Sequence, residues 1–75
     1  MTDREAHVVM LRLSEVQRLN ILRCARAIRD AKGDRKNWHK SVKNFRTCLE
    51  YYKVLGVLSG EEADGIYTTF CVNGI

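Results

Sequence analysis

Residues 38–55 read WHKSVKNFRTCLEYYKVL, and their apolar members recur at steps of three and four positions. This spacing places the apolar side chains on one side of an α-helix. The resulting stripe consists of Trp38, Val42, Phe45, Cys48, Leu49, Tyr52 and Leu55. We therefore expect a long amphipathic helix that provides the spine of the hydrophobic core.

The other side of the same helix is basic. It carries Lys36, His39, Lys40, Lys43, Arg46 and Lys53. Glu50 is the one acidic residue among them, so this side should face solvent or an anionic partner.

The chain has 75 residues, which suits a single domain spanning residues 1–75. A domain of this size buries only about 60% of the surface that its unfolded chain exposes. We therefore expect a homo-oligomer, with a dimer favoured, to provide additional buried area. Cys24, Cys48 and Cys71 are odd in number and no secretory signal precedes them, so we interpret them as reduced core residues of a cytoplasmic protein.

Charge and hydropathy narrow the classes of partner. Thirteen Lys and Arg residues against nine Asp and Glu residues give a net charge of +4, which favours an anionic partner. The same balance argues against a carboxylate-rich protein that imitates DNA. No apolar run approaches the roughly 18 residues that a membrane span requires, so we expect no membrane association.

Three helices are expected from their capping residues. Ser14 predicts a helix over residues 15 to about 32, ended by Gly33 in the left-handed region. Asp34 predicts the long helix from residue 35 to about 58. Ser59, with Glu62 three positions later, predicts a third helix that ends at Gly74. The apolar face of this third helix is Ala63, Ile66, Tyr67 and Phe70.

The N-terminal segment allows two readings. Residues 7–13 read HVVMLRL, an apolar and partly β-branched run that predicts a short strand. A lone strand would have to pair with the same strand of a second copy, across a homodimer. The alternative is a helix started by a capping box of Thr2 and Glu5. The strand is preferred, so the expected fold is mainly α: a compact three-helix domain preceded by one short β-strand.

A strand followed by two helices resembles the ribbon-helix-helix DNA-binding dimers, over residues 7 to about 58. In that family, outward strand residues read the major groove. The outward set here would be Val8, Met10 and Arg12, or Val9, Leu11 and Leu13. Either set is too apolar to read base edges. The long second helix and the third helix also depart from the family pattern. The resemblance implies a dimeric DNA-binding protein.

Catalytic and metal chemistry have little support. His7 and His39 are the only histidines, and neither belongs to a nucleophile pattern. The cysteines are more than twenty residues apart, with no Cys-x-x-Cys pair to begin a metal site. Trp38 could stack on a ligand, but its place in the apolar stripe favours a core role. We expect a non-catalytic protein without cofactor or metal.

Two surfaces are candidates for binding. On the first helix, Leu19 and Leu22 lie among arginines, and the predicted partner face is Arg18, Leu19, Leu22, Arg26 and Arg29. Alternatively, the N-terminal segment covers the two leucines. At the start of the long helix, the predicted seat for phosphate or nucleic acid is Arg35, Lys36, Asn37, Lys40 and Lys43, unless these residues form only a solvated face.

The preferred function is a small regulatory or inhibitor protein that acts by covering a protein surface. Its length and organisation are typical of small regulators and inhibitors, including those made by phages and other mobile elements. The alternatives are a dimeric nucleic-acid-binding protein that uses the basic faces of both helices, and an oligomer that sequesters a nucleotide-like anion.

Overall fold

Four α-helices and one π-helical turn follow one another along the chain in the computed structural model, which describes residues 2–72. The helices are α1 (Asp3–Arg12), α2 (Glu15–Asp30), α3 (Arg35–Val54) and α4 (Gly60–Tyr67). The π-helical turn η1 (Thr68–Val72) extends α4. The expectation of a mainly α protein is therefore confirmed, and none of the residues in 2–72 forms a strand.

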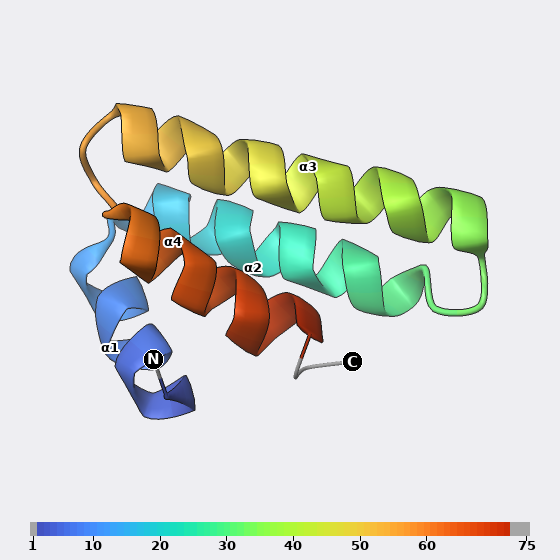
Figure 1. Cartoon of the computed structure of the whole chain (residues 1–75), viewed down its shortest axis with the longest axis horizontal. Coiled ribbons are helices and arrows are strands. Elements are labelled where there is room, and N and C mark those ends of the chain that lie inside the picture. Colours follow the sequence, from blue (N-terminus) through green and yellow to red (C-terminus); the bar gives the residue numbers. More distant parts are fainter. Residues whose placement is uncertain (1, 73–75) are drawn as a thin grey trace.

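α2 and α3 form an antiparallel hairpin with the most extensive contact between any two elements (Figure 1). α4 packs on α3 and η1 packs on α2, so that α4 and η1 together lie across one face of the hairpin. α1 packs against α4. The radius of gyration is 11.6 Å, close to the value of about 11 Å for a compact chain of this length.

The N-terminal segment is a helix, so the predicted strand over residues 7–13 is wrong. Thr2 and Glu5 form the capping box of the alternative reading: the Glu5 amide donates to Thr2 Oγ1 at 3.2 Å, and the Thr2 amide donates to Glu5 Oε1 at 3.0 Å. Hydrogen bonding of the Glu5 carboxylate, first to the backbone N–H of Thr2 and second to the Thr2 side chain, lowers the pKa of Glu5. The backbone hydrogen bonds of a helix form within the segment, so residues 3–12 offer no strand edge to a second copy.

Burial explains why this segment prefers a helix. Its buried residues are Ala6, Val9, Met10 and Leu13. A spacing of three, one and three positions fits the face of a helix and does not fit the alternation of a strand. The β-branched pair Val8 and Val9 gives only a weak local preference, which tertiary packing overrides. Because this segment forms no strand, neither the strand-paired homodimer nor the ribbon-helix-helix resemblance is supported.

The other helices begin at the expected caps, and α2 and α3 end earlier than expected. Ser14, Asp34 and Ser59 each accept a hydrogen bond from the amide three residues later, at 3.1–3.2 Å. Gly33 has φ +93°, as its predicted left-handed conformation requires. α3 ends at Val54 and not near residue 58, because Gly56 takes φ +77° and turns the chain. The predicted end at Gly74 lies outside the described residues.

The core lies where α2, α3 and α4 meet. Its fully buried large side chains are Phe45, Ile21, Ile28 and Ile66. Leu49 and Tyr52 are buried, and Trp38, Val42 and Cys48 are partly buried against the same cluster. The predicted stripe of α3 is therefore the spine of the core up to Tyr52. Leu55 is the exception, since its side chain is 52% exposed.

Phe45→Ala tests how much the Phe45 side chain contributes to the stability of the core. We expect the variant to lose about 3–5 kcal/mol of unfolding free energy, because a fully buried ring is replaced by a cavity. Urea unfolding followed by circular dichroism measures the loss. Phe45→Leu should lose less and keeps the measurement possible if the alanine variant is unfolded. Val54→Ala on the same helix, 80% exposed, should change the free energy by less than about 0.5 kcal/mol.

Candidate interaction surfaces

The outer face of α2 remains uncovered in the folded chain. Leu19 is 50% exposed and Leu22 is 42% exposed, so the N-terminal segment does not cover them. The physical reason is that Ile21, Ala25 and Ile28 occupy the core side of α2, and α1 packs against α4 instead. The remaining members of the predicted face are Arg18, which is half-buried, and Arg26 and Arg29, which are exposed.

Val16 extends this face and was missed in the sequence. It is 68% exposed and precedes Leu19 by three positions, as Leu19 precedes Leu22. Residues three apart are neighbours on a helix surface, so Val16, Leu19 and Leu22 form one exposed apolar row. The three-residue spacing of Val16, Leu19 and Leu22 is the signal in the sequence for this row.

The lysines of α3 form a second exposed surface. Lys36, Lys40 and Lys43 follow one another at four and three positions and are all exposed, which places them along one side of the helix. Arg35 is also exposed. These four cations therefore remain accessible to an anion.

Asn37, the other residue of the predicted phosphate seat, is engaged by the helix cap. Its amide donates to Asp34 Oδ1 at 3.2 Å, and its side-chain Nδ2 donates to Asp34 Oδ2 at 2.7 Å. A carboxylate of the chain itself thus occupies the start of α3, where it offsets the helix dipole. A phosphate bound here would meet the lysines along the helix and not the Asn37 amide.

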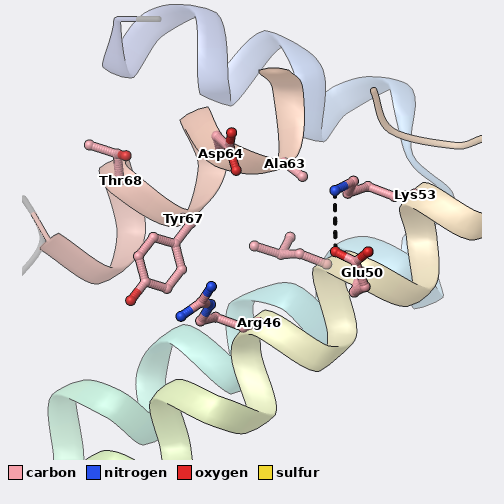
Figure 2. Close-up of a pocket in the computed structure, with 8 residues that line it drawn as sticks. Arg46, Glu50, Lys53, Ala63, Asp64, Tyr67 and Thr68 are labelled. Carbon is pink, nitrogen blue, oxygen red and sulfur yellow. Dashed lines mark hydrogen bonds and ion pairs between the residues drawn. The ribbon is translucent and has the colours of Figure 1, made fainter. Parts of the chain in front are cut away.

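A hollow of about 450 Å³ lies between α3 and α4, and no part of the sequence predicted it. Figure 2 shows its polar lining, with Lys53 Nζ 3.2 Å from Glu50 Oε2. The guanidinium of Arg46 lies 5.7 Å from the centre of the Tyr67 ring, a cation–π distance. The carboxylates of Asp64 and Glu50 together balance the positive charges of Arg46 and Lys53. The mixed charges give the hollow no preference for an anion or a cation.

A polar and sulfur-containing cluster lies between α2 and α3. Asn20 Nδ2 donates a hydrogen bond to the Tyr52 hydroxyl at 3.2 Å. Burial raises the pKa of Cys48, and the neighbouring Cys24 thiol raises it further, while a hydrogen bond with Tyr52 lowers it. Burial also raises the pKa of Tyr52, against the lowering effect of the bond from Asn20. Neither thiol is part of a disulfide.

The two histidines contact aromatic rings. His7 lies edge-on to Phe70 with ring centres 5.3 Å apart, and His39 lies edge-on to Trp38 at 5.2 Å. Among the described residues, no three side chains of His, Cys, Asp or Glu gather closely enough to hold a metal ion. No helix within residues 2–72 combines the length and the apolar composition that crossing a bilayer requires. The side chain of Cys71 lies outside the described part of the chain.

The raised pKa values of Cys48 and Tyr52 predict a loss of stability in alkali. Well below pH 9.0, the ordinary thiol value, both groups are protonated in the folded and unfolded chain. As pH rises past 9.0 and then 10.0, the unfolded chain ionises before the folded protein does, so the unfolding free energy falls. Urea unfolding between neutral and alkaline pH measures this decline.

Tyr52→Phe should make the alkaline decline shallower, because it removes one of the two groups. Tyr51→Phe is the matched control, since Tyr51 is the adjacent residue and is 58% exposed. Equal declines in both variants would contradict the role given to Tyr52.

Comparisons of the chain with protein-family models, with curated proteins and with solved structures found no match.

Proposed function

We propose that this chain is a small non-catalytic regulator or inhibitor that binds a protein partner through the outer face of α2. The observation that carries the proposal is the exposure of Leu19 and Leu22 between arginines. Folding leaves both leucines half in water although the chain forms a core elsewhere. A partner that covers them would gain about 1 kcal/mol for each half-exposed leucine.

The composition of the face supports protein binding. Arginine and large apolar residues are enriched at the centres of protein interfaces, and the face combines Leu19 and Leu22 with Arg18, Arg26 and Arg29. A matching partner would present an apolar centre for the leucines and carboxylates around it for the guanidinium groups. The net charge of +4 should accelerate encounter with such an acidic surface.

Nucleic-acid binding through α3 is the second candidate. It is favoured by the exposed Lys36, Lys40 and Lys43, which lie along one side of a 20-residue helix. Lysines in this arrangement can contact successive phosphates. The α2 face ranks first because exposed leucines cost free energy in water, whereas a solvated lysine row has a sufficient explanation in keeping a small protein dispersed.

Leu19→Ser with Leu22→Ser tests the first candidate. We expect the double variant to keep its circular dichroism spectrum, because both positions are exposed, and to lose a partner that the unmodified chain binds. Tagged protein is captured from the source cells, the partner is identified by mass spectrometry, and its affinity is measured with purified components. We expect at least a tenfold loss, corresponding to about 1.4 kcal/mol or more.

Val54→Ser is the matched control for this test. It removes an 80% exposed apolar side chain from α3 and should leave the affinity unchanged. A partner that binds the leucine variant as tightly as the unmodified chain would contradict the assignment to α2.

A replacement of Lys36, Lys40 and Lys43 by Gln tests the second candidate. Nucleic-acid binding by α3 predicts that duplex DNA or RNA binds the unmodified chain with an affinity that falls steeply with salt. The triple variant should lower the slope of log affinity against log salt by about 3, because three phosphate contacts are removed. Arg26→Gln with Arg29→Gln is the control on α2. The absence of any complex at low salt would eliminate this candidate.

A further inference from the structure

Cys24 and Cys48 occupy facing positions of the α2–α3 hairpin. The hydrogen bond between Asn20 and Tyr52 fixes which turns of the two helices lie opposite each other. Cys24 follows Asn20 by four residues, and Cys48 precedes Tyr52 by four residues. In an antiparallel pair of helices, one turn forward on one helix meets one turn backward on the other. The two cysteines are therefore the next facing pair.

The surroundings of the two thiols support this register. Both cysteines are partly buried at the edge of the core, so each keeps some contact with solvent. The Cys48 thiol interacts with both the Cys24 thiol and the Tyr52 hydroxyl. A small oxidant can thus reach a site where two thiols already lie together.

We propose that Cys24 and Cys48 are a dithiol oxidation site, which a peroxide converts into an intramolecular disulfide between α2 and α3. The site goes beyond the proposed partner binding and does not depend on it. It also gives the cysteines a role other than packing, while leaving them reduced in the absence of oxidant.

The chemistry balances with the peroxide as the only added reagent. One thiol, as its thiolate, attacks a peroxide oxygen; the O–O bond breaks, hydroxide leaves, and a sulfenic acid forms. The second thiolate attacks the sulfenic sulfur; the S–O bond breaks and the S–S bond forms. The hydroxides take up the two thiol protons. In total, two thiols and hydrogen peroxide give one disulfide and two water molecules.

The disulfide would hold together the two helices with the most extensive contact in the fold. A cross-link between residues 24 and 48 restricts the unfolded chain, because it closes the loop that contains the turn between α2 and α3. We therefore expect the oxidised protein to unfold at a higher urea concentration than the reduced protein. Treatment with a thiol reductant should reverse this shift.

The test uses the full chain with Cys71→Ser, which leaves only the facing pair. Hydrogen peroxide is added in slight excess over protein, and the intact mass is followed with time in native buffer and in concentrated urea. We expect the native protein to lose two hydrogen atoms and remain one chain, with a several-fold larger share of intramolecular disulfide relative to oxygen-containing products than in urea, because the facing thiol lies ready to attack the sulfenic acid. Proteolysis without reductant should yield a peptide pair that joins Cys24 to Cys48.

Two further variants make the outcome specific. Cys24→Ser and Cys48→Ser, each combined with Cys71→Ser, should show no loss of two hydrogens and no rise in the urea midpoint after peroxide. The proposal is overturned if the facing pair gains oxygen atoms in place of the disulfide, links separate chains, or gives no larger share of intramolecular disulfide in the folded protein than in urea.

Discussion

The burial of the Phe45 ring is the contribution on which the rest of the packing depends. Phe45 is completely buried, and its ring meets the Tyr67 ring of α4 edge-on with centres 6.1 Å apart. Ile21 and Ile28 of α2 and Ile66 of α4 are buried in the same cluster. A helix as short as the 8-residue α4 is marginal alone in water, and most of the stability of helices in folded proteins comes from packing such as this shared core. Each helix turns its apolar side toward this core, and its other side is thereby placed at the surface.

α2 shows how this constraint creates a surface. Its core side is made by Ile21, Ala25 and Ile28, and this orientation leaves Leu19 and Leu22 on the other side. α1 could have covered them, but the burial of its own face depends on α4, to which Arg12 is also joined by an ion pair with Glu62. The exposed leucines are thus a consequence of competing packing, and a partner is the remaining way to remove them from water.

Features that depend on residues within one helix, such as its caps, can be predicted from the sequence. Features that depend on how two elements pack against each other cannot. The caps at Ser14, Asp34 and Ser59 were predictable because each bond joins residues three apart. The N-terminal helix was mistaken for a strand because its short apolar run has no decisive period until its burial is known. The sequence does not determine the exposure of Leu19 either, because that depends on where the N-terminal segment packs. The Cys24–Cys48 pairing needs the register between α2 and α3, which no spacing within either helix specifies.

The two proposals for α2 use different sides of the helix and are therefore compatible. Cys24 follows Leu22 by two residues, and residues two apart do not share a helix face. A disulfide to Cys48 would fasten the side of α2 that meets α3 while leaving the leucine and arginine face open to a partner. It would also restrict the motion of α2 relative to α3 before a partner arrives. Because the proposed partner face lies on α2 alone, this restriction leaves the arrangement of its residues unchanged.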